Sequence, residues 1–456
     1  MKIRRFALCF AMLLTAAFAL VLSGCGNNGA VKPPPEDKDT VGITFPSRVR
    51  KTDGQFYTAG KVQYPDSLWT APKYEYDPEL DSTVTGCEGV KAFFMDSPIT
   101  HNGKQTKIMG YIGFPDGASA SSKVPGIVLV PGSGASASAD WVKLWNDHGY
   151  AAVVIDVEGG QAQPECSLDA PNLHMERNKY YNGAIDPAFT AGPSEADGVN
   201  GNRFYFQSPE TIGNFYMYHA TSAVILANSL LRADPRVDEN KVGITGISGG
   251  GIICSILIGY DDRYAFAMPV YGNVTFEGTA GWFNSFGGAL YKEAWGDLGP
   301  LQASKTPVLW MNGDKDAALG LDGTIESYDA TQNGFLVIKP AMPHGMRTGA
   351  EQGELFVFAD AVTGRDNQII KITEPPLQDS AKFTYRIGFD VTVNSISLYY
   401  TSDLKLSSAV WQKIPIDLPQ KEYTVEFTYP ETAKYCYINI NYNYNLAASC
   451  PLVRFI

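Results

Sequence analysis

The stretch "KVGITGISGGGIICSILIGY", residues 241–260, decides how the chain folds. An apolar run typical of a buried strand leads into glycines around Ser248, and a second apolar run typical of a buried helix follows. Gly246 and Gly250 flank the serine at the two positions where a Cβ atom would crowd a sharp turn. The pattern therefore predicts a strand–turn–helix unit with Ser248 at its apex, in strained backbone.

The spacing excludes two other glycine-rich loops. A dinucleotide-binding loop needs the order GxGxxG after a strand, whereas residues 243–251 read GITGISGGG. A Walker-type phosphate loop needs a lysine followed by serine or threonine after its second glycine, and neither follows here. What remains is the nucleophile elbow GxSxG, in which the serine hydroxyl attacks a substrate.

A serine hydroxyl needs a base to take its proton, usually a histidine held by a carboxylate. With this elbow the order along the chain is serine, acid, histidine. Only His344, in the loop "KPAMPHGMRTG", follows Ser248, so we expect it to be the base. The chain has five histidines: His101, His148, His174, His219 and His344.

The remaining groups of the expected site lie in two loops. The strand "TPVLWMNG", residues 306–313, is followed by Asp314 and Asp316, and chain order alone leaves both open as the acid. More distant candidates are Asp322 and Glu326. A tetrahedral intermediate also needs backbone N–H donors. We expect these from Gly249 and from Ser133 and Gly134 in the loop "PGSGAS".

Strand and helix patterns alternate over most of the chain, which predicts a largely parallel sheet covered by helices. A strand at 126–130, a helix starting after Ser138 and ending at Gly149, and a strand at 151–157 form the first such unit. A further helix is expected from Ser208 to about Ala233. Between them, residues 158–207 have no periodic pattern and are expected to form a lid or a substrate-binding insert.

The pattern changes again after residue 367. From 368 to 456 strand patterns follow one another without helical segments between them, which predicts a small all-β sandwich-like domain.

The N-terminal residues are expected to be a targeting segment. A basic start and an apolar run predict a signal peptide over residues 1–24, and the quartet ending at Cys25 looks like a bacterial lipobox. A transmembrane anchor would need roughly 20 apolar residues, which is longer than this run. We therefore expect Cys25 to be lipidated, residues 25–84 to be a flexible tether and N-terminal extension, and the protein to be membrane-anchored outside the cytoplasm.

Composition narrows the possible partners. The chain of 456 residues carries a formal net charge of −12, which disfavours nucleic acid. Neither a CxxC pair nor an HExxH motif occurs, so no metal or cofactor is expected.

Five of the seven cysteines lie beyond the signal and the lipobox. In an oxidising compartment Cys436 could bridge to Cys450 and Cys87 could reach Cys166, which leaves Cys254 as a buried thiol behind the serine turn; the sequence leaves the pairing open.

Several segments carry a family likeness. Together they resemble bacterial α/β-hydrolase esterases of the acetyl xylan esterase and dienelactone hydrolase type, which are relatives of the prolyl oligopeptidase catalytic domain. These segments are "VLVPGSGASASADWVKLWNDHGYAAVVIDVEG" (128–159), "YHATSAVILANSLLRADPRVDENKVGITGISGGG" (218–251), "WMNGDKDA" (310–317) and "MPHG" (342–345). The likeness implies an α/β-hydrolase domain over 85–367.

By matching positions, the resemblance also implies the triad Ser248, Asp316 and His344, with the acid three residues after the loop glycine. Two positions depart from it. Gly249 stands where many relatives have a large aromatic residue, which predicts extra space beside the nucleophile. Pro131–Gly134 stands where relatives have an HGGG-like loop.

The expected function is therefore hydrolysis of carboxylic esters through an acyl-serine intermediate, with acetylated polysaccharide or a small ester as substrate. Aromatic residues of the insert could stack on sugar rings: Tyr180, Tyr181, Tyr205 and Phe206. Two alternatives stay open, namely a serine peptidase of the prolyl oligopeptidase type and a non-catalytic glycan-binding surface lipoprotein.

Overall fold

The computed structural model describes residues 43, 45, 62–101, 104–157, 162–172, 216–275, 288–419 and 423–455. All of them belong to one compact unit, Asp39–Ile456. The expected signal peptide, Cys25, His174 and the four aromatic residues of the insert lie outside the described residues. The predictions made for them therefore stay predictions.

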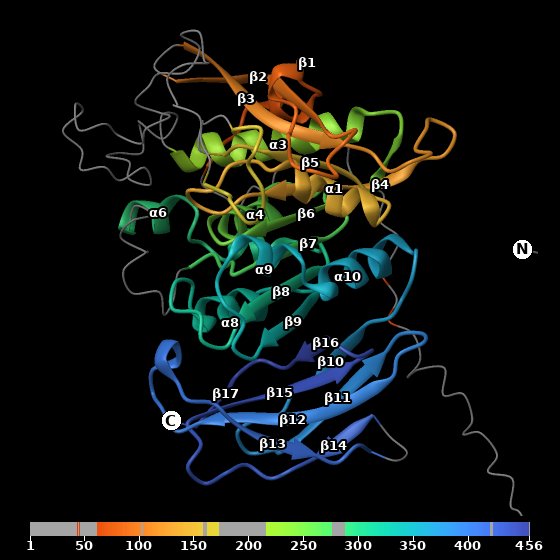
Figure 1. The fold of residues 1–456 in the computed structure, drawn as a ribbon. Helices are drawn as coiled ribbons and strands as arrows, with labels where there is room; N and C mark the ends of the chain where they lie inside the picture. Colours follow the sequence, from red (N-terminus) through yellow and green to blue (C-terminus); the bar gives the residue numbers. More distant parts are fainter. Residues whose placement is uncertain are drawn as a thin grey trace, which may run out of the picture. The chain divides into compact units, whose positions relative to one another are not determined.

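A mixed sheet forms the centre of the fold (Figure 1). Within the described ranges it has nine strands in the order β1-β2-β3-β5-β4-β6-β7-β8-β9. The strands from β5 to β9 run parallel, and β1, β2 and β3 add to them antiparallel. Their bounds are β1 Tyr74–Tyr76, β2 Lys91–His101, β3 Lys104–Gly113, β4 Val124–Val130, β5 Ala151–Ile155, β6 Val237–Ile247, β7 Ala267–Val270, β8 Val308–Gly313 and β9 Gly334–Lys339.

The order of the strands determines which face of the sheet each helix covers. The chain passes from β4 through α1 to β5 in one direction, and from β5 through α3 to β6 and α4 to β7 in the other. Because such crossovers are right-handed, α1 covers one face of the sheet and α3 and α4 the other. Helix bounds are α1 Ala139–Asp147, α3 Tyr216–Ala233, α4 Gly249–Tyr260, α6 Gly288–Ala294, α7 Gly299–Ala303, α8 Leu321–Asp329, α9 Met346–Ala350 and α10 Gly353–Thr363; short 3-10 helices are η1 Asp66–Trp69, η2 Pro78–Leu80 and η5 Leu406–Ser408.

After β4 the chain adds β5 on one side of this strand and then β6 on the other, so a topological switch point lies between β4 and β6. In open α/β sheets, ligands bind outside the carboxyl ends of the strands at such a switch point. Ser248 directly follows β6, and the loop of Ser133 follows β4, so both lie at this point.

Both boundaries of helix α1 agree with the prediction. The helix ends where predicted, since Gly149 follows with a φ of +80°. Ser138 occupies the N-cap position, but its hydroxyl makes no capping hydrogen bond and is buried without a partner among the described residues. The predicted start of the next helix at Ser208 lies outside the described residues, and α3 is described from Tyr216.

Two antiparallel sheets make up the C-terminal part of the chain (Figure 1). One has the order β10-β11-β14, and in the other β13-β12-β15-β16 is joined by β17, which pairs with β15. Their bounds are β10 Ile370–Glu374, β11 Lys382–Ile387, β12 Val393–Thr401, β13 Gln412–Ile416, β14 Thr424–Glu426, β15 Tyr435–Tyr442, β16 Leu446–Ser449 and β17 Val453–Arg454. The predicted fold class, an α/β-hydrolase fold followed by a small all-β domain, is confirmed.

Side chains of the β domain cap the outer strand of the central sheet. In β9, the Ile338 N–H donates to Ser449 Oγ at 2.9 Å, and the Ile338 carbonyl accepts from the Asn439 side-chain amide at 3.0 Å. Next to this strand the buried Glu354 carboxylate pairs with Lys339 and accepts the Ala447 N–H at 2.7 Å. An edge strand with unpaired backbone groups is a template for aggregation, and these contacts cover it.

The two disulfides considered from the sequence, Cys436–Cys450 and Cys87–Cys166, are absent from the structure, in which the five described cysteines are buried thiols outside any disulfide. The strand register gives the reason in the β domain. Cys450 lies opposite Ile438, whose N–H donates to Cys450 Sγ at 3.0 Å, whereas Cys436 lies diagonally, two residues away on β15. Diagonal neighbours stand about 7–8 Å apart, which is beyond the usual reach of a disulfide. Cys254 is buried, as expected.

No helix within the described residues is long and apolar enough to cross a membrane.

Removing the Ser449 hydroxyl should weaken the attachment of the β domain. Ser449→Ala leaves the buried Ile338 N–H without its acceptor, which typically costs about 1–3 kcal/mol. We expect urea unfolding to report this loss in the free energy of unfolding. Ser408→Ala, which alters an exposed hydroxyl of the same domain, should stay within about 0.5 kcal/mol. Equal effects of the two substitutions would argue against the capping role.

Candidate active site

Ser248 sits between β6 and α4 in a backbone conformation that few residues adopt. Its φ is 58° and its ψ is −118°. The Ser248 N–H donates to the Val270 carbonyl at 2.9 Å, and the Ser248 carbonyl accepts the Ile252 N–H at 3.0 Å. A conformation of this kind costs a non-glycine residue about 1–3 kcal/mol. The neighbouring strand β7 and the first turn of α4 hold it in place.

Glycines are required on both sides of the serine because backbone atoms occupy the space of their side chains. A Cβ atom on Gly246 would lie 2.1 Å from the Gly250 carbonyl oxygen. One on Gly250 would lie 2.0 Å from the Val130 carbonyl oxygen, in the adjacent strand β4. The turn therefore packs directly on the backbone of the central strand, which fixes where the Ser248 side chain emerges.

The structure brings Ser248, His344 and Asp316 together in one hydrogen-bonded chain. His344 Nε2 lies 2.9 Å from Ser248 Oγ, and His344 Nδ1 lies 2.6 Å from Asp316 Oδ2. The other Asp316 oxygen accepts the N–H groups of Ala318 and Leu319 at 2.8 and 3.0 Å. Asp316 is thus buried and held by its own loop, with one oxygen left to orient the imidazole.

The other candidate acids are engaged elsewhere. The Asp314 carboxylate accepts the Ala341 N–H at 2.8 Å. Asp322 pairs with Arg454 at 3.0 Å, and Glu326 accepts a hydrogen bond from the Thr275 hydroxyl. Of the four carboxylates that chain order left open, Asp316 is the one that contacts His344.

The other described histidines belong to other elements of the fold. His148 ends α1 and stacks on Phe356 of α10 with ring centroids 3.8 Å apart, while His219 is buried in α3. His101 closes strand β2 at the hairpin with β3.

The predicted oxyanion loop lies directly beside the nucleophile, and the expected extra space is not there. A Cβ atom on Gly249 would lie 2.2 Å from Ser133 Oγ and 2.8 Å from the Ser133 backbone nitrogen. The Ser133 side chain therefore fills the space beside Gly249 that was expected to be empty. A glycine at 249 is the sterically required partner of this loop.

Two backbone N–H groups are available next to Ser248. Gly249 is the first residue of α4, so its N–H has no partner within the helix. Neither this N–H nor that of Ser133 finds an acceptor among the described residues. Gly134 contributes a φ of +78°, which turns the loop back toward α1. The Ser133 hydroxyl is also buried without a partner in the described part of the chain.

Tyr271 is a residue of the site that sequence reasoning missed. Its ring lies 4.4 Å from the His344 ring, and its hydroxyl donates to the Pro343 carbonyl at 2.7 Å. Burial raises the pKa of Tyr271. Its φ of 53° is unusual for a tyrosine. The only signal in the sequence is the place of Tyr271 at the end of a buried strand, one residue before a glycine. In the structure, Tyr271 packs against the histidine loop and hydrogen-bonds to it.

Helix α9 connects the histidine loop to both neighbouring loops. The Gly132 N–H donates to Met346 Sδ at 3.4 Å, which joins α9 to the oxyanion loop. Arg347 hydrogen-bonds Asp169 and lies 3.4 Å from Asp140 in α1. The described part of the insert, 162–172, is therefore tied beside His344.

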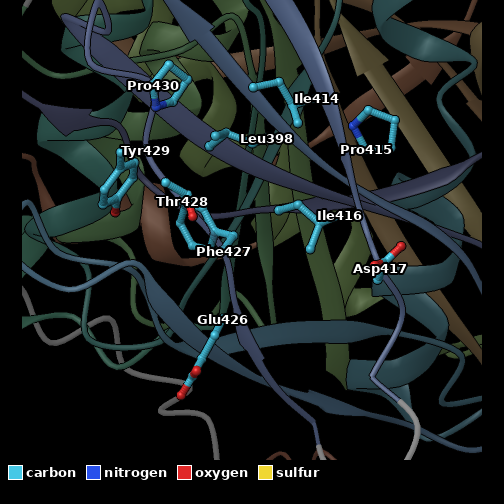
Figure 2. Close-up of a pocket in the computed structure, with 10 residues that line it drawn as sticks. All are labelled: Leu398, Ile414, Pro415, Ile416, Asp417, Glu426, Phe427, Thr428, Tyr429 and Pro430. Atoms are coloured by element: carbon cyan, nitrogen blue, oxygen red, sulfur yellow. The ribbon is translucent and has the colours of Figure 1, made fainter.

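The C-terminal domain has a separate hollow of about 490 Å³ (Figure 2). Its wall is mostly apolar, and no residue of the triad lines it. Within the described residues, no group of three or more histidines, cysteines and carboxylates is arranged to hold a metal ion.

Part of the chain is similar to a known protein family. The sequence profile of the prolyl oligopeptidase family, Peptidase_S9, matches residues 221–358. That range contains Ser248, Asp316 and His344. No curated protein sequence matches the chain significantly.

Similar solved structures include both peptidases and esterases. An acylaminoacyl peptidase from Pyrococcus horikoshii is 17% identical with a TM-score of 0.40, over 59% of this chain and 40% of its own. The chain thus spans less than half of that peptidase. An acetyl xylan esterase from Paenibacillus sp. R4 is 17% identical with a TM-score of 0.45, over 65% of this chain and 91% of its own. A glucuronoyl esterase from Caldicellulosiruptor kristjansonii is 14% identical with a TM-score of 0.41, over 67% and 82%.

Gly250→Ala should destabilise the fold, because its Cβ would meet two backbone oxygens, those of Val130 and Pro131, at 2.0 and 2.5 Å. We expect urea unfolding to show a loss of roughly 1–3 kcal/mol, as for other overpacked sites. Gly345→Ala is the matched control, since its nearest neighbour would be Thr348 Oγ1 at 3.7 Å. A control variant as unstable as Gly250→Ala would contradict the steric argument.

Asp314 should give the stability of the protein a specific pH dependence. Burial raises the pKa of Asp314, so the folded state holds this proton more tightly than the unfolded chain does. As pH rises from about 3.9 through the raised pKa, the wild type loses stability from this group. Asp314→Asn cannot titrate, so the free energy of unfolding of the variant minus that of the wild type should increase over this window. Urea unfolding across a pH series tests this, and a difference that stays flat or falls contradicts it.

Proposed function

We propose that this chain, a member of the α/β-hydrolase superfamily, is a serine hydrolase that cleaves carboxylic esters through an acyl-serine intermediate. The observation that carries the proposal is the bridging position of His344, 2.9 Å from Ser248 Oγ and 2.6 Å from Asp316 Oδ2. These distances are those of a nucleophile, its base and the group that orients the base.

In the acylation step, Ser248 Oγ attacks the acyl carbon while His344 Nε2 takes the hydroxyl proton. The carbonyl oxygen becomes an oxyanion, and the N–H groups of Gly249 and Ser133 are its donors. Asp316 keeps the His344 Nδ1–H oriented and stabilises the imidazolium that forms. Collapse of the intermediate breaks the ester C–O bond, and His344 gives its proton to the leaving alcohol.

In the deacylation step, water takes the place of the alcohol. His344 removes a proton from the water, whose oxygen attacks the acyl-serine carbonyl at the same donors. Collapse of this second intermediate breaks the bond between the acyl carbon and Ser248 Oγ, and His344 returns the proton to Oγ as the carboxylic acid leaves. No metal or cofactor takes part in this proposed scheme.

We propose acetylated polysaccharide or oligosaccharide as the substrate class. The sequence resemblance to acetyl xylan esterases supports this choice.

A serine peptidase is the second candidate, because the family profile that matches residues 221–358 is that of prolyl oligopeptidases. Peptidase and esterase would use the same triad and the same acyl-serine intermediate. They differ in the leaving group, which is an amine in one and an alcohol in the other.

Substrate comparison separates the candidates. We expect the protein to release acetate from acetylated xylan and to hydrolyse p-nitrophenyl acetate, with kcat/KM well above that for a peptide p-nitroanilide. Ser248→Ala should abolish the activity, and Asp316→Asn should lower kcat by roughly 10⁴, as loss of the orienting carboxylate does in other triads. A higher kcat/KM for the anilide would favour the peptidase.

A fluorophosphonate label tests catalysis itself, because only an activated serine reacts with it. We expect one adduct, mapped by mass spectrometry to the peptide containing Ser248. A protein that binds glycan but takes no label would instead be a binding lipoprotein.

A further inference from the structure

Asp314 joins three parts of the molecule, although it does not contact His344. It lies two residues before Asp316, at the end of β8, and it is only 2% exposed. One carboxylate oxygen accepts the Ala341 N–H at 2.8 Å, in the loop that leads to His344. The Asp314 N–H donates to the Lys339 carbonyl at 3.2 Å, at the end of β9. Asp314 therefore links the loop of the acid to the loop of the base.

The third part is the C-terminal β domain. The indole N–H of Trp411 donates to the Asp314 backbone carbonyl at 3.0 Å, and the Tyr437 hydroxyl lies 3.3 Å from the second Asp314 carboxylate oxygen. Trp411 immediately precedes β13, and Tyr437 lies in β15. Aromatic side chains of the β domain thus contact the backbone carbonyl of Asp314 and one oxygen of its carboxylate.

These two aromatic side chains are held rigidly. The Tyr437 ring is fully buried and stacks on Tyr399 of β12, with centroids 5.0 Å apart and planes 7° apart. The Trp411 ring meets Tyr437 edge-on at 5.0 Å. Aromatic pairs in such arrangements are favourable beyond the contribution of their buried area, which favours this position of the two donor groups.

We infer that Trp411 and Tyr437 of the β domain act through Asp314 as positioning residues that set the spacing between Asp316 and His344. The inference rests on the proposed function, because it concerns the same triad. Displacing a catalytic group by about 1 Å can cost about 10²-fold in rate, so a hydrogen bond that fixes both loops has leverage on kcat. Neither aromatic residue takes part in a chemical step.

Conservative variants test this role. Tyr437→Phe removes one hydroxyl and Trp411→Phe removes the indole N–H, and both keep an aromatic ring in the stack. Tyr399→Phe is the matched control, since it makes the same change in the ring that stacks on Tyr437 without touching Asp314. The measurements are the rate of fluorophosphonate labelling at Ser248, kcat and KM for p-nitrophenyl acetate, and the melting temperature, so that rates are compared where each variant is folded.

We expect each of the two variants to label about five-fold more slowly, and the double variant about 20-fold more slowly. The value of kcat should fall by the same factors, KM should stay unchanged, and Tyr399→Phe should remain within about two-fold of the wild type. A purely structural role would lower the melting temperature of all three variants without this split between kcat and KM.

Three results would overturn the inference. Wild-type labelling rates in the double variant would show that the junction does not position the triad. Equal slowing in Tyr399→Phe would show a general effect of the aromatic cluster. Absence of labelling in the wild type would contradict the proposed serine hydrolase function itself. The first two results, in which the wild type is labelled, would contradict only the positioning role of Trp411 and Tyr437.

Discussion

The positive φ of Ser248 is the constraint on which the rest of the site depends. This backbone conformation persists because strands β4 and β7 and the first turn of α4 surround the turn. The packing of the sheet thus offsets the energetic cost of the strained residue. Gly246 and Gly250 allow the backbones to approach closely enough for this. The carboxyl ends of β8 and β9 then deliver Asp316 and His344 to the same edge.

Chain order was sufficient to predict the histidine, because only one follows the elbow serine. It was insufficient for the acid, since Asp314 and Asp316 differ by two residues and both side chains are buried. The distinction arises from the turn after β8, which directs Asp316 to the imidazole and Asp314 to the Ala341 N–H and the β domain. The family resemblance indicated Asp316, the residue that contacts His344, whereas chain order left both carboxylates open.

Other features depend on contacts between distant segments, which no local pattern encodes. The fit of Ser133 against Gly249 is one example, because the glycine alone suggested empty space. The thiols of Cys436 and Cys450 are another, since their separation depends on the register between β15 and β16. Tyr271 resembles any other residue at the end of a buried strand until the histidine loop folds over it. In each case the element was predictable and the partner was not.

The capped edge of β9 has a consequence for folding. Ser449, which accepts the Ile338 N–H, comes 111 residues later in the chain. Until the last strands are in place, the border strand of the hydrolase sheet keeps unpaired backbone groups and the acid loop lacks its aromatic support. Completion of the active site therefore coincides with folding of the C-terminal end of the chain.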